Sequence, residues 1–260
     1  MAARPVALIT GASMGLGAEF ARLFAANGHD LVLTARSADK LAAVRREIEG
    51  LHGAAVRIIV ADLADPGAPQ AIFDEVTGAG VEIDVLVNNA GFGMYGSFHE
   101  TVADENMNMI QVNVNALVLL TRLFLDGMVA RRRGRILNVA STAAFQPGPM
   151  QSVYYATKAF VLSFTEAIAN ELHGTGVTAT ALCPGPVLTG FQERANVGEV
   201  RGLRLMMRTT PEEVVRAGFD AMIRGRPLVI PGSLNRTLAF LVRFFPRRVV
   251  TAMVRRIQSR

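Results

Sequence analysis

The feature that most limits the fold of this chain is the regular alternation of short apolar runs, rich in β-branched residues, with longer helical patterns. Strands that alternate with helices predict a parallel sheet covered by helices on both faces. After the third strand-like run, helical patterns lie near residues 68–77, 104–130, 153–173 and 211–224. The strand-like runs are Pro5–Thr10, Leu31–Ala35, Val56–Ala61, Val85–Asn89, Arg135–Ser141, Val177–Cys183 and Leu228–Ile230.

Composition supports one folded domain with a large core. Half of the 260 residues are apolar and 19% are charged, so extensive disorder is not expected. After the second strand, Ser37 caps a helix in which Leu41, Val44, Ile48 and Leu51 are predicted to face inward. The single cysteine, Cys183, excludes an internal disulfide framework and a cysteine metal cluster, and no metal site is predicted.

The chain shows no targeting segment and no membrane-spanning pattern. Its N-terminus runs directly into the first strand without the apolar stretch of a signal peptide. No run of 18 or more apolar residues occurs, so no transmembrane helix is expected. Together with the single cysteine, this predicts a cytoplasmic protein.

Charge is distributed unevenly along the chain. Residues 1–200 carry 14 Lys and Arg against 19 Asp and Glu, whereas residues 201–260 carry 13 Arg against only three acidic residues. The last 60 residues therefore have a net charge of +10 and require an anionic neighbour, inside the protein or outside it.

A glycine-rich turn joins the first strand to the first helix. It reads Thr10-Gly11-Ala12-Ser13-Met14-Gly15-Leu16-Gly17. Glycines let the backbone approach a pyrophosphate, and the helix N-terminus offers free N–H groups to an anion. The spacing is G-x-x-x-G-x-G rather than the more common G-x-G-x-x-G, and a turn without a ligand is the alternative. The predicted nucleotide-binding residues of the turn are Gly11, Ser13, Met14, Gly15, Leu16 and Gly17.

The end of the second strand indicates which nucleotide binds. NAD enzymes usually carry Asp or Glu here, to accept hydrogen bonds from the ribose hydroxyls. This strand ends Thr34-Ala35-Arg36-Ser37, without an acid. Arg36 can pair with a 2′-phosphate, and Ser13 can add a hydroxyl, so NADP is preferred. The alternative is that Arg36 is a surface arginine.

Tyr154 and Lys158 form a pair four residues apart on a predicted helix. The chain has 27 basic residues but only two lysines, Lys40 and Lys158, so lysine at this position needs a reason. Positions i and i+4 share a helix face. A nearby ammonium favours the phenolate and is expected to lower the pKa of Tyr154, which suits acid–base chemistry. A surface pair without function is the alternative, and Tyr155 could also face Lys158.

Three more polar motifs follow strands. Asn88-Asn89-Ala90-Gly91 ends the fourth strand, Ser141 ends the fifth, and Pro184-Gly185-Pro186-Val187-Leu188-Thr189 follows the sixth. Strand carboxyl ends are where ligands bind in open α/β sheets. Together with the turn and the Tyr/Lys pair, these motifs closely resemble the short-chain dehydrogenase/reductase family over about residues 5–232.

This resemblance implies a doubly wound Rossmann-type parallel sheet of about seven strands and a homodimer or homotetramer. It implies that Tyr154 is the general acid, that Lys158 binds the nicotinamide ribose, and that Ser141 hydrogen-bonds the substrate carbonyl. The family pattern and the 13-residue step from Ser141 select Tyr154 over Tyr155. The other implied residues are Asn113, which holds a relay water; Asp62 and Leu63 at adenine; Asn89, Ala90 and Gly91 at its ribose; and Pro184, Gly185, Val187 and Thr189 at the nicotinamide amide.

The expected substrate is a hydrophobic ketone or secondary alcohol, such as a 3-ketoacyl, steroid-like or aromatic carbonyl. Apolar loops follow the strand ends, and methionine adapts to irregular shapes. These loops include the segment from Thr189 to Thr209, which contains Met206 and Met207. The alternative is that the loop residues only pack the loops. The predicted substrate residues are Phe92, Met94, Tyr95, Phe145 and Met150.

The predicted Rossmann-fold domain covers residues 1–232. Residues 233–260 are predicted to form a basic amphipathic helical extension of it. Leu238, Leu241, Val242 and Phe245 recur at helical spacing, and Pro246 opens a second helix. Such a stripe usually packs within the protein, where it can cover the substrate cleft, or against a subunit, and this is the preferred interpretation. The alternative is weak contact of residues 236–260 with an anionic membrane surface. No motif supports nucleic acid binding.

The sequence thus predicts an NADP(H)-dependent oxidoreductase. A non-catalytic NADP-binding regulatory or scaffold protein on the same fold is one alternative, because fold alone does not decide function. The complete set of Asn113, Ser141, Tyr154 and Lys158 argues against it, since a binding protein needs no proton donor. An epimerase or dehydratase that uses the same Tyr/Lys pair is a second alternative.

Overall fold

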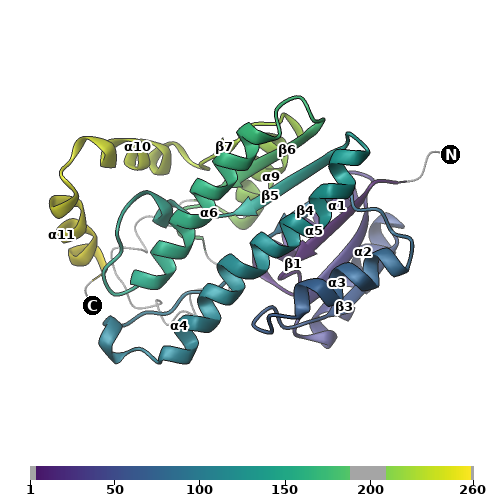
Figure 1. The fold of residues 1–260 in the computed structure, drawn as a ribbon, viewed down its shortest axis with the longest axis horizontal. Helices are drawn as coiled ribbons and strands as arrows, with labels where there is room; N and C mark the ends of the chain where they lie inside the picture. Colours follow the sequence, from purple (N-terminus) through teal and green to yellow (C-terminus); the bar gives the residue numbers. More distant parts are fainter. Residues whose placement is uncertain (1–3, 188–208, 259–260) are drawn as a thin grey trace.

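A seven-stranded parallel sheet forms the centre of the protein. The computed structural model describes residues 4–187 and 209–258. The strand order is β3-β2-β1-β4-β5-β6-β7, and every pair is parallel (Figure 1). The strands are β1 (Val6–Thr10), β2 (Asp30–Ala35), β3 (Val56–Val60), β4 (Val85–Asn88), β5 (Gly134–Val139), β6 (Val177–Leu182) and β7 (Leu228–Val229).

Helices cover both faces of this sheet, which confirms the doubly wound fold. One face buries a core between the strands and α1, α2 and α9. The other packs against α3, α5 and α6. The helices are α1 (Gly15–Ala26), α2 (Ala38–His52), α3 (Ala68–Gly78), α4 (Ala103–Ile110), α5 (Leu117–Ala130), α6 (Ser152–Glu171), α9 (Pro211–Ile223), α10 (Ser233–Leu241) and α11 (Arg247–Gln258), with short turns η1 (Phe98–Glu100), η2 (Gln111–Ala116), η3 (Thr142–Phe145) and η4 (Val242–Phe244).

The chain reverses its direction of winding between β1 and β4. From β1 the chain moves outward through β2 and β3, then returns to pair β4 with the other side of β1. The carboxyl ends of these central strands consequently open onto a crevice, which is the usual ligand site of such sheets. The glycine turn that follows β1 lies at this switch point.

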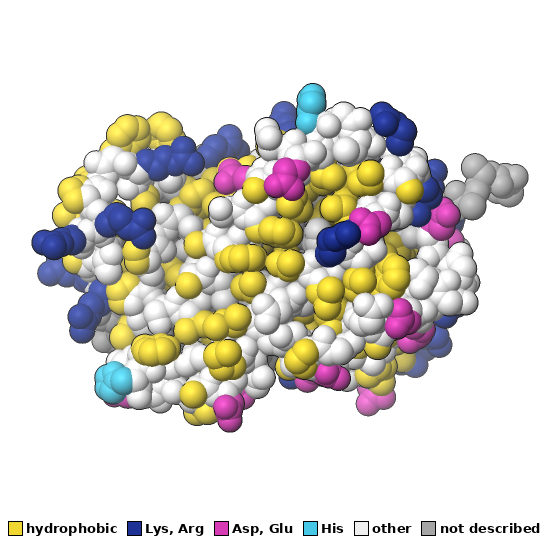
Figure 2. Space-filling model, viewed as in Figure 1, with side chains coloured by type: hydrophobic (Ala, Val, Ile, Leu, Met, Phe, Trp, Pro, Cys, Tyr) yellow, Lys and Arg dark blue, Asp and Glu magenta, His cyan; other side chains and the backbone are white. Residues whose placement is uncertain are grey.

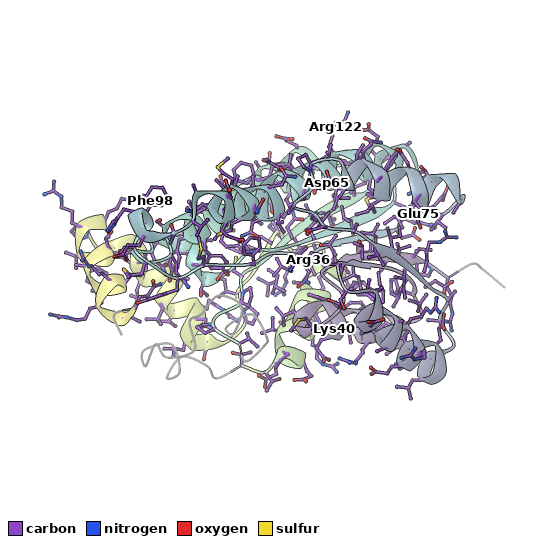
Figure 3. All side chains as sticks on the ribbon, turned by 90° about the horizontal axis from the view of Figure 1, so that it is seen from below. Arg36, Lys40, Asp65, Glu75, Phe98 and Arg122 are labelled. Carbon is purple, nitrogen blue, oxygen red and sulfur yellow. The ribbon has the colours of Figure 1, made fainter. Side chains whose placement is uncertain are left out.

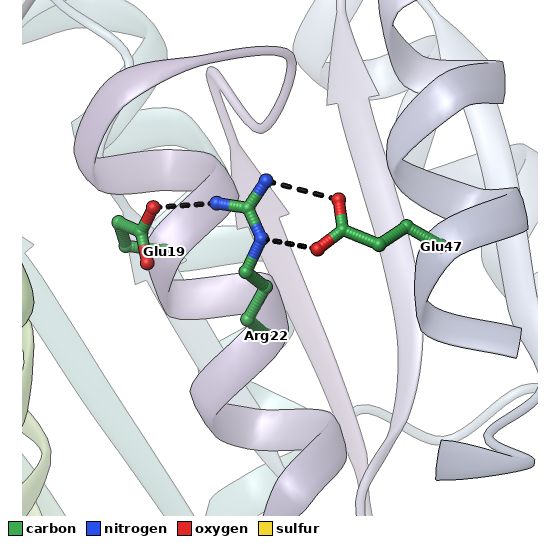
Figure 4. A network of polar contacts seen from close by, with 3 residues as sticks. All are labelled: Glu19, Arg22 and Glu47. Carbon is green, nitrogen blue, oxygen red and sulfur yellow. Dashed lines mark hydrogen bonds and ion pairs between the residues drawn. The ribbon is translucent and has the colours of Figure 1, made fainter. Parts of the chain in front are cut away.

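An ion-pair network fixes the first helix against the second (Figure 4). Arg22 of α1 donates two hydrogen bonds to Glu47 of α2, at 2.7 and 3.0 Å, and a third to Glu19 at 2.5 Å. A bidentate pair of this kind specifies geometry as well as attraction. It therefore helps to hold α1 against α2, the helices that follow the phosphate turn and Arg36.

The predicted helix near 104–130 is interrupted at its centre. α4 and α5 are joined by η2, a π-helical turn, and run on as one element. By length and hydropathy, Ala103–Ala130 could also cross a membrane. Here α5 packs on β4, β5 and α3, and this face of the helix buries Leu120, Phe124 and Met128 in the core of the domain. Turns of the π type occur frequently at functional sites.

One prediction about apolar side chains is wrong. Leu51 does not face inward: it is 71% exposed, because the last turn of α2 extends past the core that Leu41, Val44 and Ile48 reach. The stripe near the C-terminus does not pack within the chain: Leu238, Leu241 and Phe245 are 38, 42 and 51% exposed. Its contact with another subunit stays a prediction.

A buried chain of amides and hydroxyls ties the central strands to the helices beneath the site. Asn88 of β4 donates to Asn138 of β5 at 2.9 Å and to Thr121 of α5 at 3.0 Å. Asn138 in turn donates to Thr165 of α6 at 2.9 Å. Buried polar groups are costly unless they are paired, so each member holds the others in place.

Replacing Asn138 with alanine should therefore destabilise the protein markedly. Asn88 would lose its acceptor and Thr165 its donor in a dry interior, which costs about 1–3 kcal/mol. The free energy of unfolding in urea measures the effect. Asn115→Ala is the matched control, because Asn115 is exposed and its side chain donates to Gln111 of the same helical turn, so its change should stay within about 0.5 kcal/mol. Equal losses in both variants would contradict this role of the buried chain.

Candidate active site

One cavity of about 550 Å³ runs along the carboxyl edge of the sheet. It joins the glycine turn at one end to Ser141, Tyr154 and Lys158 at the other. The structure thus brings together motifs that are spread over more than two thirds of the chain. Of the predicted residues, the cavity is lined by Gly11, Ser13, Met14, Gly15, Leu16, Arg36, Asp62, Leu63, Asn89, Ala90, Gly91, Phe92, Ser141, Tyr154, Lys158, Pro184, Gly185 and Val187.

The glycine turn is built as a close-fitting cradle. Gly11 has φ +66°, a left-handed conformation that favours glycine. A Cβ on Gly17 would stand 2.2 Å from the carbonyl oxygen of Gly11, so Gly17 serves the close contact of helix and turn rather than lining the cavity. Asn89 donates to the carbonyl oxygen of Thr10 at 2.9 Å and fixes the turn to the end of β4. This arrangement fits the pyrophosphate of a dinucleotide at the N-terminus of α1.

The far end of the cavity is cationic. Arg36 and Lys40 both line it and lie near one another at the start of α2 (Figure 3). Asp62 lies 3.6 Å from Arg36 Nη1 and comes from the end of β3. The Arg36 side chain is 57% exposed, so the ion pair leaves it accessible to an anion. No acid ends β2, in agreement with the sequence-based prediction.

Tyr154 and Lys158 meet where the carboxyl end of β5 faces α6. Lys158 is 5% exposed, and its Nζ donates to the carbonyl oxygen of Val139 at 2.7 Å. The same Nζ lies 5.9 Å from the centroid of the Tyr154 ring. The Tyr154 hydroxyl is hydrogen-bonded to Ser141, whose Oγ also accepts from the amide of Ala143 at 3.1 Å. Tyr154, rather than Tyr155, therefore shares the site with Ser141.

The expected effect of Lys158 on the Tyr154 pKa is wrong in this structure. Burial raises the pKa of Tyr154 above its usual value, and the hydrogen bond from Ser141 offsets only part of that rise. Burial also lowers the pKa of Lys158 to about 8, so the ammonium is still mostly charged at neutral pH. Tyr154 is therefore protonated near neutral pH and can donate to a carbonyl oxygen, but the raised pKa makes it a weaker acid than the sequence interpretation predicts.

Asn113 lies in the π-helical turn and does not line the cavity. Its side chain is 1% exposed and bonds Phe92 in both directions: Nδ2 donates to the carbonyl oxygen at 2.9 Å, and Oδ1 accepts from the amide at 3.0 Å. It also donates to Thr157 at 3.1 Å. A Cβ on Gly91 would meet Asn113 Oδ1 at 3.0 Å and Lys158 Nζ at 3.4 Å. Asn113 thus holds the loop after β4 against α6; its role with a relay water stays a prediction.

Most of the predicted substrate residues do not line the cavity. Phe92 lines the cavity, whereas Phe145 packs against the core cluster around α6. Met150 has φ +69°, and its carbonyl oxygen accepts from the amide of Gly96 at 2.8 Å, which ties two loops together. Met94 and Tyr95 do not line the cavity. Thr189, Met206 and Met207 lie outside the described residues.

Several cavity residues were missed by the sequence interpretation. Lys40 could have been found from the sequence, because it is one of only two lysines in the chain. Both lysines line the cavity. Tyr155 was treated only as a competitor for the role of Tyr154. Gln151, Thr142 and Ala143 had no signal, since their position depends on how the loop after β5 folds back over the sheet.

A family profile described as short chain dehydrogenase matches residues 5–199, and the chain belongs to that family. It is an oxidoreductase that acts on CH–OH and C=O groups with a nicotinamide cofactor. The rat 17-beta-hydroxysteroid dehydrogenase type 3 (Rattus norvegicus) is 34% identical over 246 residues, which cover 94% of this chain and 77% of that protein.

Two other similar proteins carry the nucleotide in their names. The NADP-dependent 3-hydroxy acid dehydrogenase YdfG of Salmonella typhi is 37% identical over 193 residues, covering 74% of this chain and 75% of that protein. A solved short-chain dehydrogenase from Sphingobium yanoikuyae in complex with NADPH superimposes with a TM-score of 0.82. It is 31% identical, and the match covers 94% of this chain and 97% of that structure.

Replacing Tyr154 with phenylalanine should remove the proton donor and leave the cofactor cradle intact. General acids contribute about 10²–10⁴-fold to a rate, so carbonyl reduction should fall by that factor. NADPH affinity, followed by nucleotide fluorescence, should change little. Tyr155→Phe keeps the donor and should slow hydride transfer by less than about tenfold. A larger loss in Tyr155→Phe than in Tyr154→Phe would overturn the assignment.

Proposed function

We propose that this protein is an NADP(H)-dependent reductase of hydrophobic ketones, or a dehydrogenase of the corresponding secondary alcohols. The observation that carries the proposal is the shared cavity, in which the Ser141–Tyr154 hydrogen bond and the buried Lys158 stand at one end and Arg36 and Lys40 at the other. A regulatory or scaffold protein would need the cationic end but not the proton donor. An epimerase or dehydratase stays the less favoured alternative.

Each catalytic residue of the cavity has its own role in the transfer of a hydride and a proton to the carbonyl group. When bound, the nicotinamide supplies a hydride to the carbonyl carbon or accepts one from it. Ser141 and Tyr154 hold the carbonyl oxygen with their hydroxyls and stabilise the negative charge that develops there. Tyr154 then transfers its phenolic proton to that oxygen. Lys158 keeps a positive charge beside the tyrosine and donates to Val139, which fixes its position on β5.

Preference for NADP over NAD rests on the cationic end of the cavity. Arg36, Ser37 and Lys40 surround the position after β2 where NAD enzymes carry an acid. A guanidinium binds a phosphate through charge-assisted hydrogen bonds. Relatives whose names include NADP, and the solved NADPH complex, support the same choice.

Arg36→Ala should weaken NADPH binding and leave NADH binding nearly unchanged. Losing a hydrogen bond to a charged group costs about 1.5–3 kcal/mol, or roughly 10- to 150-fold in Kd. Titration of each nucleotide measures both values. Arg45→Ala is the matched control, since Arg45 lies on α2, the helix that follows Arg36, pairs with Glu49 and is outside the cavity. A wild-type protein that prefers NADH would refute the role given to Arg36.

Hydrophobic substrates and self-association are supported by apolar surfaces. The match to a steroid dehydrogenase favours a bulky apolar substrate.

We propose a homodimer or homotetramer because an apolar groove lies open between the α4–η2 segment and α6. The groove is formed by Ile110, Val114, Val153, Ala156 and Phe160. We propose that the protein is located in the cytoplasm, whose reducing conditions suit the buried free thiol of Cys183.

We propose that the exposed apolar side chains of the basic extension contact an anionic membrane surface; a contact with another subunit is the alternative. Residues 221–260 contain nine arginines and no Asp or Glu. Figure 2 shows basic and apolar side chains mixed at the end of the molecule where α10 and α11 lie. Mixed Arg and Phe or Leu side chains fit an anionic bilayer surface. The exposed apolar residues of this extension are Leu234, Leu238, Phe240, Leu241, Phe244, Phe245, Val249 and Met253.

Flotation with liposomes tests this surface. The wild-type protein should float with vesicles that contain phosphatidylglycerol and not with neutral phosphatidylcholine vesicles. Phe244→Asp combined with Phe245→Asp should abolish flotation, because both insertion and charge attraction are weakened. Leu51→Asp, at an exposed apolar residue of α2, should float like the wild type. Equal flotation of all three proteins, or of none, would end the membrane proposal.

A further inference from the structure

A buried asparagine of the C-terminal extension packs directly on the segment that follows β6. Asn235 of α10 is 8% exposed, whereas its neighbours Leu234 and Arg236 are exposed. A Cβ on Gly185 would stand 2.5 Å from Asn235 Nδ2 and 2.7 Å from Oδ1, and its three nearest atoms all belong to this amide. The backbone of Gly185 has no left-handed φ that would itself favour glycine. Glycine at this position therefore serves the close contact with α10.

The turn that leads from β7 into α10 holds the Asn235 amide in place. Asn235 Nδ2 donates to the carbonyl oxygen of Pro231 at 2.9 Å. Gly232, the N-cap of α10, has φ +84°, and a Cβ there would stand 3.2 Å from the same Nδ2. Close contact with two glycines leaves the amide little room to move. Asn235 can therefore act as a fixed support for Gly185.

The segment that Asn235 supports forms the wall of the cavity at its reacting end. Pro184 and Gly185 both line the cavity, and the carbonyl oxygen of Pro184 accepts from the amide after Ser141 at 2.9 Å. In the proposed reaction, the hydride must reach a carbonyl carbon whose oxygen is held by Ser141 and Tyr154. The nicotinamide must then lie beside this segment. α10 also lies against η3, the turn that follows Ser141.

The far end of the extension is attached to the domain in a similar way. Gln258 of α11 is 1% exposed, and its side-chain amide is hydrogen-bonded to the Tyr155 hydroxyl at 2.5 Å. Its backbone carbonyl oxygen accepts from the Tyr95 hydroxyl at 2.6 Å. No described residue of α10 or α11 lines the cavity itself. The extension is thus fixed by one buried amide on each helix, and it contacts the cavity wall from outside.

We propose that Asn235 is a positioning residue, which fixes the segment after β6 so that this segment holds the nicotinamide ring for hydride transfer. This role rests on the proposed function, because it requires a nicotinamide beside Ser141. Asn235 contacts the side of Gly185 that is turned away from the cavity. Its loss should therefore loosen the nicotinamide end of the cavity and leave the cationic end at Arg36 intact.

Two nucleotides distinguish these ends. NADPH reaches both, whereas adenosine 2′,5′-bisphosphate has no nicotinamide and reaches only the cationic end. Asn235→Ala should weaken the binding of NADPH and not that of the bisphosphate. It should also slow hydride transfer in a single turnover by about 10- to 100-fold, because a small misplacement of the reacting atoms is costly. The transfer is measured on whichever of acetophenone, decanone and androstenedione the wild type reduces fastest. Thr237→Ala, at an exposed position of α10, is the matched control and should leave all three values unchanged.

A second pair of variants tests the contact itself. Gly185→Ala places a methyl group against the Asn235 amide and should impair hydride transfer. Adding Asn235→Ala removes the amide from the path of that methyl group, so the double variant should transfer hydride faster than Gly185→Ala alone.

Three results would overturn the role of Asn235 alone. They are NADPH binding and hydride transfer that stay unchanged in Asn235→Ala, an equal loss of affinity for both nucleotides in that variant, and a double variant no faster than Gly185→Ala. A wild-type protein that binds no NADPH, or reduces none of the three ketones, would overturn the proposed function together with this role.

Discussion

Parallel pairing of β1 with β4 and of β4 with β5 is the constraint on which the rest of the structure depends. Parallel strands bring their carboxyl ends to one edge, so the glycine turn, the Asn89 segment and Ser141 become neighbours. Asn89 then locks the turn to β4, and the Asn88–Asn138 pair joins β4 to β5 below the cavity. Catalytic geometry here is thus a consequence of sheet topology.

Burial decides the chemistry at this edge. Tyr154 and Lys158 lie in an interior where charge is disfavoured, which keeps the tyrosine protonated and brings the lysine pKa to about 8. The carbonyl oxygen of Val139 stabilises the remaining ammonium. At the opposite end, Arg36 and Lys40 stay accessible to solvent and to anions. The same cavity thus has one end lined by the buried Tyr154 and Lys158 and another lined by the solvent-exposed, cationic Arg36 and Lys40.

Local patterns predicted the regular elements well because their periodicity reflects burial on one face. The sequence predicts all seven strands within about two residues, and most of the turn, Arg36 and Tyr154 line the cavity. Predictions failed where a helix extends beyond the core against which it packs. Leu51 belongs to the apolar face of α2, yet its turn extends beyond the sheet. The interruption of the long helix at Asn113 had no local signal, since contacts with Phe92 and Thr157 accompany it.

By itself, the sequence determined the order of strands and helices, the nucleotide turn, the missing acid after β2 and the four-residue spacing of Tyr154 and Lys158. These features are encoded by neighbours along the chain. Only the tertiary structure decided that Lys40 joins the cavity, that Ser141 pairs with Tyr154, and that Gln258 holds Tyr155. Such contacts join residues as far as 103 positions apart, so they exist only after the sheet has brought their elements together.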